Sequence, residues 1–216
     1  MSEFDITGRN KIKRMPERGH YDHETVYAIV DEALICHVGI VQDGQPVVIP
    51  TIHARIGDSI VLHGAKASRL LKYVGEGHRV CITVTHIDGL VLARSVFHHS
   101  MNYRSAVIFG RGYVIEDLDE RREAMRAITE HLIPGRWDDA RQPTSKEDKG
   151  TAFVKINIED ASAKIRTGPP GDEDEDYTLP IWAGIIPIRP VYLQPEPDPV
   201  LNEGIDVPDY VKNYSR

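Results

Sequence analysis

The sequence predicts a mainly β protein, best described as a closed antiparallel barrel with a few helices at its periphery. Short runs rich in β-branched residues follow one another along most of the chain. Turn-forming pairs such as Asp43-Gly44 separate several of these runs, as they do in hairpins. The regular alternation of strands and helices that a parallel sheet requires is missing.

The 216 residues suit one domain with an extension at each end. Residues 1–20 are polar and basic and predict an extended N-terminal arm. Residues 21–194 hold the predicted barrel domain. Residues 195–216 are rich in Pro, Asp and Asn and predict a C-terminal tail on the surface.

Three helices are predicted from a capping residue followed by apolar residues at helical spacing. They begin at Asp22, Ser68 and Asp117, and Gly75 and Gly77 end the second. The apolar positions are Val26, Ile29, Val30 and Ala33 in the first helix and Ala124, Met125, Ile128 and Leu132 in the third.

The remaining apolar runs predict strands joined by tight turns. The predicted strands span residues 34–41, 45–55, 59–63, 79–86, 90–97, 104–116, 151–158 and 161–166. Asp88-Gly89 predicts a hairpin turn. Pro46 and Pro50 either bend the second strand or mark it as an edge strand, because a prolyl residue cannot donate to the ladder. Residues 168–176, GPPGDEDED, predict a solvated acidic loop.

The composition is that of a globular protein, with 41% hydrophobic and 27% charged residues. The net charge of −7 argues against a general nucleic-acid-binding protein, which needs a concentrated basic face, but leaves room for a small phosphate site.

Cys36 and Cys81 lie inside apolar runs and predict buried, reduced thiols. No apolar run is long enough to span a membrane and no signal peptide opens the chain, so we expect a cytoplasmic protein.

The stretch VLHGAKASRLLKYV carries the features of a phosphate site. A strand ends at His63, and Gly64 leaves room for the close approach of a ligand. Lys66, Ser68 and Arg69 then gather at a helix start, where free backbone N–H groups and the helix dipole favour an anion. A capped helix with solvated Lys and Arg side chains explains the same residues, and spacing alone favours that explanation.

Two further stretches could contribute to a ligand site. Pro50-Thr51 interrupts a strand, which frees backbone groups for a ligand, although an edge strand is the stronger explanation of this pair. A polar cluster precedes an apolar strand and could offer hydrogen-bond donors to a polar heterocycle, or bond locally in a loop. Its members are Ser100, Asn102, Tyr103 and Arg104.

Other chemistries find little support in the sequence. There are ten histidines, but HExxH, CxxC and compact His/Asp clusters are absent, and the adjacent pair His98-His99 would point to opposite faces of a strand. We therefore expect no metal site. The sequence also lacks the GxSxG elbow of serine hydrolases, the GxGxxG dinucleotide fingerprint and the P-loop motif.

The predicted phosphate site, the Pro50-Thr51 strand and the polar cluster, taken in their order along the chain, resemble the pyridoxamine 5′-phosphate oxidase-related flavoproteins. The resemblance is greatest to the branch of flavin-nucleotide-binding proteins that includes the nitroimidazole-resistance proteins. The resemblance spans about residues 14 to 189. It is carried by KRMPERGHYD, ALICHVGIVQDGQPVVIPTIHARIGDSIVLHG, AKASRLLKYV, SMNYRSAVIFGRGYVIED and LPIWAGIIPI. The ordered set of these pieces is specific to this family.

The resemblance implies an antiparallel split β-barrel of Greek-key type that binds FMN at a homodimer interface. In this family the strand-to-helix turn holds the flavin phosphate. The matching residues here are Lys66, Ser68 and Arg69, next to the strand end His63-Gly64.

The same resemblance places other residues around the flavin ring. Backbone and side chains of Ile49, Pro50 and Thr51 would lie along the isoalloxazine ring, and Trp182 would line the pocket. A further region would close over the flavin, often from the second subunit, and it corresponds to Ser100, Asn102, Tyr103 and Arg104.

The chain departs from the pyridoxamine phosphate oxidases proper at its C-terminal end. Those enzymes grip their substrate with C-terminal Arg and His residues, whereas this chain has the run Ile185-Ile186-Pro187-Ile188-Arg189. We therefore expect the fold and the FMN to be shared, but not pyridoxamine phosphate oxidation.

The resemblance predicts an FMN-dependent oxidoreductase acting on a small molecule that the sequence does not identify. His53, His63 or His99 could relay a proton, although each is individually more often structural. Two alternatives remain: a non-catalytic flavin-binding or flavin-sensing protein, and a haem- or deazaflavin-binding relative on the same barrel.

Overall fold

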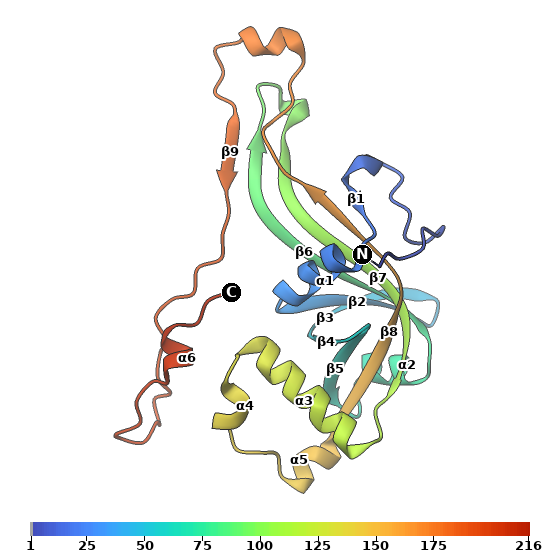
Figure 1. Cartoon of the computed structure of the whole chain (residues 1–216), viewed down its shortest axis with the longest axis vertical. Coiled ribbons are helices and arrows are strands. Elements are labelled where there is room, and N and C mark those ends of the chain that lie inside the picture. The colour runs from blue at the N-terminus through green and yellow to red at the C-terminus, as the bar shows by residue number, and fades with distance from the viewer. Residues whose placement is uncertain (1) are drawn as a thin grey trace. The chain divides into compact units, whose positions relative to one another are not determined.

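The computed structural model describes residues 2–216 (Figure 1). These residues form two compact units. Unit 1 consists of the chain up to Pro50 together with Val80–Gly110 and Ile158–Arg189. Unit 2 consists of Thr51–Arg79, Arg111–Asn157 and Pro190–Arg216. Each unit therefore combines stretches that are far apart in the sequence.

Strands dominate the structure, as the sequence predicts. The strands are β1 (Gly19–His20), β2 (Ile35–Gln42), β3 (Gln45–Ile52), β4 (Ala54–Ile56), β5 (Ser59–Ala65), β6 (Arg79–Leu92), β7 (Ser100–Val114), β8 (Thr151–Arg166) and β9 (Gly184–Pro187). The helices are α1 (His23–Glu32), α2 (Arg69–Gly75), α3 (Leu118–Leu132), α4 (Arg136–Asp139), α5 (Ser145–Gly150) and α6 (Asp209–Lys212). In residues 2–216 we find no helix of the length and apolar character needed to cross a membrane.

Unit 1 is built on strands in the order β3–β2–β6–β7–β8, with β1 beside β8 and β9 beside β6. The register places Val38 of β2 opposite Ile82 of β6, and both side chains are buried. Helix α1 begins where the sequence predicts, because the Asp22 carboxylate accepts a hydrogen bond from the Thr25 N–H at 2.7 Å. The hairpin between β2 and β3 also turns at the predicted Asp43-Gly44 pair.

Unit 2 combines β4, β5 and the first half of β8 with α2 and α3. Its hydrophobic core consists of Ala54, Val61, Ile115, Ala124, Ile128 and Phe153. Met125 and Leu132 pack against this core, so the predicted apolar face of α3 is confirmed. Asp117 caps α3 by accepting from the N–H groups of its first turn, as predicted.

The hairpin predicted at Asp88-Gly89 is wrong, because β6 continues through both residues. Gly89 does not form a turn but allows β9 to pack closely against β6. A Cβ at this position would lie 3.0 Å from side-chain and backbone atoms of β9. Asp88 is held in the strand by an ion pair with Arg104. The chain turns after β6, through a helical turn at Val96–His98.

Other strand boundaries also differ from the prediction. The strand predicted over residues 45–55 is divided at His53 into β3 and β4, and the last two predicted strands are one continuous strand, β8. The two acidic residues at the predicted break, Glu159 and Asp160, both form ion pairs with Arg9, which neutralises part of their charge. A polar pair therefore lies inside a strand without ending it.

The polar ends of the chain pack more closely than the sequence suggests. Phe4 and Asn10 of the N-terminal arm are buried. In the tail, the Tyr210 hydroxyl of α6 donates to the Asp139 carboxylate at 2.6 Å. The acidic loop is not simply solvated, because the Asp172 carboxylate accepts hydrogen bonds from backbone and side-chain N–H groups of the turn that follows β6.

Candidate functional site

The residues predicted to hold a phosphate lie where β5 leads into α2 in unit 2. His63 and Gly64 are near the end of β5, and Arg69 is the first residue of α2. Ser68 caps that helix, since its hydroxyl oxygen accepts a hydrogen bond from the Leu71 N–H at 3.5 Å. Ser68 therefore caps the helix, as expected from the alternative explanation of a capped helix with solvated Lys and Arg side chains.

A cavity of about 430 Å³ lies beside this turn. Its charged lining consists of Lys66, Lys72, Arg121 and Glu116. The ammonium groups of Lys66 and Lys72 form no hydrogen bond or ion pair with any group of residues 2–216. The rest of the lining is apolar and consists of Leu71, Val114, Ile115 and Ala152. Two unpaired cations beside an apolar wall suit an anionic group that is attached to a larger, less polar molecule.

Arg121 is fixed in place by the backbone around it. Its Nη2 donates to the carbonyl oxygens of Asp148 and Thr151 at 2.8 and 3.2 Å. Its guanidinium carbon lies 5.2 Å from the centroid of the Phe153 ring. Arg121 is therefore a rigid cation at the cavity, whereas the two lysines keep freedom to adjust to a ligand.

His63 contacts the same aromatic ring. Its imidazole stacks on Phe153 with a centroid distance of 5.9 Å and an interplanar angle of 20°. Partial burial lowers the pKa of His63, because desolvation disfavours the charged imidazolium. The lowered pKa favours the neutral imidazole, which can accept a proton or bind a metal ion.

The remaining predicted site residues belong to unit 1, apart from Thr51, which is the first residue of unit 2. Ile49 is half-buried and Pro50 is exposed, both on β3. Ser100 and Tyr103 lie at the start of β7, where Ser100 is exposed and Tyr103 is half-buried.

Arg104 of β7 is engaged by two carboxylates of unit 1. Its Nη2 donates to Asp88 Oδ1 at 2.9 Å and to Glu32 Oε1 at 2.8 Å, and its Nε donates to Asp88 Oδ2 at 3.0 Å. Hydrogen bonds from Arg104 lower the pKa of Glu32 and of Asp88. The charge of Arg104 is thus balanced within unit 1.

Asn102 and Trp182 have different surroundings. Asn102 is buried, and its Nδ2 donates to the Gly168 carbonyl oxygen at 3.2 Å while its Oδ1 accepts from Arg166. Trp182 is 67% exposed and packs its indole against Gly184, where an added Cβ would lie 2.9 Å from the ring. Asn102 therefore contributes to the internal structure of unit 1, whereas most of the Trp182 ring is accessible.

The sequence alone missed two of the cations at the cavity. Lys72 could have been found from the sequence, because it follows the helix cap Ser68 by four residues, which is about one helical turn. In the structure its N–H donates to the Ser68 carbonyl oxygen. Arg121 reaches the cavity because α3 packs beside the start of β8, and no local pattern predicts that contact.

A pair of imidazoles forms a second feature of unit 2. His53 has no exposed surface, and its ring centroid lies 5.1 Å from that of His131 on α3, with the rings tilted by 51°. The sequence pointed to His53 as a proton relay but did not single out His131. Imidazole nitrogens are common axial ligands of haem iron. Over residues 2–216, His, Cys, Asp and Glu side chains form no group of three or more that could hold a metal ion.

Comparison with solved structures gives two close matches over nearly the whole chain. The flavocytochrome Anf3 from Azotobacter vinelandii is 41% identical with a TM-score of 0.89, and the match covers 95% of each chain. The FAD and haem binding protein from Mycobacterium smegmatis is 36% identical with a TM-score of 0.86, and the match covers 90% of this chain and 95% of that one.

A more distant match shares the fold. It is a candidate 5-nitroimidazole antibiotic resistance protein from Bacteroides thetaiotaomicron, 24% identical with a TM-score of 0.56, covering 68% of this chain and 86% of that one. A search among curated proteins finds no match.

The family model described as pyridoxamine 5′-phosphate oxidase matches residues 22–165, which is most of the chain. Together with the solved structures, this match confirms the predicted mainly β, split-barrel fold. The chain belongs to the pyridoxamine 5′-phosphate oxidase family.

Proposed function

We propose that the protein is a flavin-dependent oxidoreductase that acts on a small molecule. One observation carries the proposal: Lys66 and Lys72 face a cavity of about 430 Å³ with no anionic partner on their ammonium groups within residues 2–216. This cavity lies at the turn where the family resemblance places the flavin phosphate. The flavocytochrome and the FAD-binding relative, both more than a third identical to this chain, support the same cofactor class.

The identity of the flavin is part of the proposal. The sequence predicts FMN, whereas the mycobacterial relative binds FAD. Either molecule carries a phosphate on the ribityl chain, and the lysines would bind that group. We retain FMN as the prediction, and FAD is the alternative that the relative favours.

The residues of the chain would perform three tasks around a bound flavin. The flavin itself would supply the redox chemistry. Lys66 and Lys72 would neutralise its phosphate, and Arg121 would keep the positive potential in place through its bonds to the backbone. His63 would accept or return a proton, because desolvation lowers its pKa and favours the neutral imidazole.

The visible absorption spectrum of the protein, purified without added flavin, tests this proposal. The released chromophore is then identified by chromatography and mass. A yellow protein that releases FMN or FAD at near one per chain supports the proposal and decides between the two. A colourless protein that takes up neither FMN nor FAD contradicts it.

Turnover separates an enzyme from a flavin-binding or flavin-sensing protein. The flavin-loaded protein is mixed with NADH or NADPH and an electron acceptor, and oxidation of the nicotinamide is followed. Sustained turnover supports an oxidoreductase. Flavin reduction that never proceeds beyond one cycle with any acceptor favours the non-catalytic alternative.

We also propose a haem as a second cofactor of unit 2. The buried His53 next to His131 supports this, because imidazole is a common haem ligand and two relatives are haem or cytochrome proteins. Haem titration of the purified protein should produce a Soret band that His53→Ala or His131→Ala removes. His78→Ala is the matched control, since His78 is exposed and pairs with Glu76. A Soret band that survives both changes contradicts these ligands.

We propose that a second copy of the chain covers an exposed apolar surface of unit 1. Its members, from β6, β9 and the turns beside them, are Leu90, Val96, Phe97, Ile181, Trp182 and Ile186. Leu90 and Ile186 are direct partners in the β6–β9 pairing, and both are exposed. Exposed apolar residues on paired strands and the turns beside them are typical of a protein interface.

Sedimentation tests the homodimer. The protein should sediment as a dimer, and Phe97→Asp, at a residue that is 85% exposed, should shift it to the monomer. Val200→Asp is the matched control, because Val200 is 84% exposed but lies in the tail. A monomeric wild-type protein would contradict the homodimer, and with it a flavin site at the interface of two subunits.

The proposal places the protein in the cytoplasm. Its two cysteines are free, and burial raises the pKa of Cys36 to about 12 and also raises that of Cys81. Unreactive free thiols suit a reducing compartment.

A further inference from the structure

The segment between α3 and β8 in unit 2 has a defined hydrogen-bonding pattern, although it adds nothing to the core. It contains α4 and α5, and neither helix has a buried residue. The Glu130 carboxylate nevertheless accepts hydrogen bonds from the N–H groups of Gly135 and Trp137 at 2.7 and 2.8 Å. Arg141 donates to both carboxylate oxygens of Glu147 at 2.8 and 2.9 Å. Hydrogen bonds, not burial, therefore hold this segment in place.

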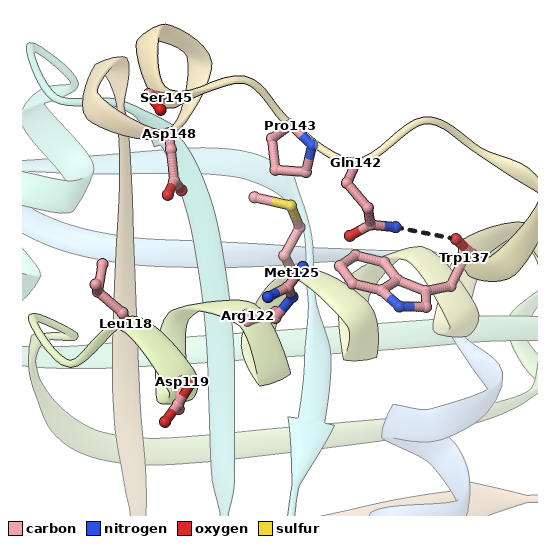
Figure 2. A pocket seen from close by; sticks show the side chains of 9 residues that line it. All are labelled: Leu118, Asp119, Arg122, Met125, Trp137, Gln142, Pro143, Ser145 and Asp148. Atoms are coloured by element: carbon pink, nitrogen blue, oxygen red, sulfur yellow. Dashed lines mark hydrogen bonds between the residues drawn. The ribbon is translucent and has the colours of Figure 1, made fainter.

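The segment between α3 and β8 encloses a slot against α3. Figure 2 shows Met125 of α3, Trp137 of α4 and Pro143 of the following loop around a cavity of about 340 Å³. A second cavity of about 240 Å³ is lined by the same three residues and by Gln142. The slot therefore continues past the indole of Trp137 into this second cavity.

The walls of the slot suit a planar aromatic ring. Indole and prolyl rings offer flat apolar faces, and the thioether of Met125 makes favourable contacts with aromatic edges. Gln142 holds the wall in place, since its Nε2 donates to the Trp137 carbonyl oxygen at 3.4 Å.

The charge at the slot favours an anionic substituent on that ring. Arg122 lines the cavity, and its guanidinium has no hydrogen-bond or ion-pair partner within the described part of the chain, residues 2–216. Asp148 also lines the cavity, but its carboxylate lies 3.4 Å from Arg121 Nη2 and is partly neutralised. Asp119 also lines the cavity, but on the side away from Trp137 and Pro143 (Figure 2). Arg122 is therefore the charge available to a ligand.

We propose that this slot binds a small planar aromatic anion, with its ring against Trp137 and Pro143 and its carboxylate or similar group on Arg122. The site is separate from the cavity beside α2, with which it shares none of its lining residues. It gives the protein a second small-molecule site that does not depend on the proposed flavin.

Proton–nitrogen correlation NMR of the full isotope-labelled chain tests the site, with naphthoate as the probe. The chain has two tryptophans, so its two indole N–H signals are assigned with the Trp182→Phe variant. Naphthoate should shift the Trp137 signal saturably, with a dissociation constant below about 1 mM, and leave the Trp182 signal in place. The result should be the same with and without added FMN.

Two variants and one uncharged analogue separate the proposed contacts from non-specific binding. Arg122→Gln should weaken naphthoate binding by about tenfold, because a charge-assisted hydrogen bond is lost. Arg126→Gln is the control, since Arg126 is exposed on the same helix but does not line the slot. Naphthylmethanol should bind as weakly to the wild type as naphthoate does to Arg122→Gln.

Three results would overturn the proposal. The first is an unchanged Trp137 signal at saturating probe. The second is equal naphthoate affinity of Arg122→Gln and the wild type. The third is competition between naphthoate and FMN for the Trp137 signal, which would make the slot part of the flavin site.

Discussion

Units 1 and 2 each place basic side chains next to strands, but they use the charge in opposite ways. In unit 1, Arg104 donates to Glu32 and Asp88 and its charge is balanced. In unit 2, Lys66 and Lys72 face a cavity, with no partner on either ammonium group among residues 2–216. A paired cation stabilises a fold, whereas an unpaired cation at a cavity is available to a ligand. The partners of a basic residue, not its type, therefore indicate which unit binds an anion.

The largest expected effect comes from removing both unpaired cations. Lys66→Ala combined with Lys72→Ala should weaken FMN binding by about a hundredfold, because two charge-assisted contacts to the phosphate are lost. Flavin fluorescence quenching measures the affinity. Lys146→Ala, at an exposed lysine of α5, is the control and should bind FMN as the wild type does. Unchanged affinity of the double variant would remove the phosphate from this cavity.

The complementary change in unit 1 should act on folding. Arg104→Ala leaves two neighbouring carboxylates without their partner and should lower the free energy of unfolding by about 1–2 kcal/mol, a value limited by the partial exposure of the ion pairs. Urea denaturation measures this free energy. If Arg104→Ala instead keeps its stability and loses flavin affinity, the residue closes over the flavin, as the family resemblance implies.

A smaller effect distinguishes two neighbouring cations of α2. The sequence assigns Arg69 to the phosphate, whereas Lys72 lines the cavity and Arg69 does not. Lys72→Ala should therefore weaken FMN binding by about tenfold, and Arg69→Ala by about threefold through long-range attraction alone. Titrating FMN into both variants at low and high salt checks this. The reverse order of affinities would favour the assignment from the sequence.

The smallest effect is the pH dependence of the unit 1 ion pairs. The pKa values of Glu32 and Asp88 are lowered in the folded protein. Their contribution to stability is therefore complete above the unfolded pKa values and is lost as pH falls through the folded ones. The difference in unfolding free energy between the wild type and Arg104→Ala should hold from about pH 7 to about pH 5 and shrink as the pH falls further to about pH 3. A difference that stays constant over this range would show that these carboxylates do not carry the effect.

The sequence predicted those parts of the fold that depend on neighbouring residues. Asp22 and Asp117 cap their helices as expected, and Asp43-Gly44 forms its turn with both residues at positive φ. The similar pair Asp88-Gly89 gave a wrong turn prediction, because its glycine makes room for β9, which lies far away in the sequence. Local signals cannot distinguish a glycine needed for a turn from one needed for close packing.

The same limit applies to the candidate site. Lys66 was found because it follows a strand end and precedes a helix cap. Arg121 was missed because it reaches the cavity through its bond to the Thr151 carbonyl oxygen at the start of β8. The sequence also could not reveal that Glu32 and Asp88 surround Arg104, since those residues are distant from it in the chain.

The central claim is that the lysines of unit 2 bind a flavin phosphate, and one comparison tests it directly. The affinities of the wild type and of the double Lys66→Ala, Lys72→Ala variant are measured for FMN and for riboflavin, which lacks the phosphate. We predict that the wild type prefers FMN by about a hundredfold and that the double variant binds both flavins equally weakly. A preference for FMN that survives in the double variant would contradict the account, because the phosphate would then be held elsewhere.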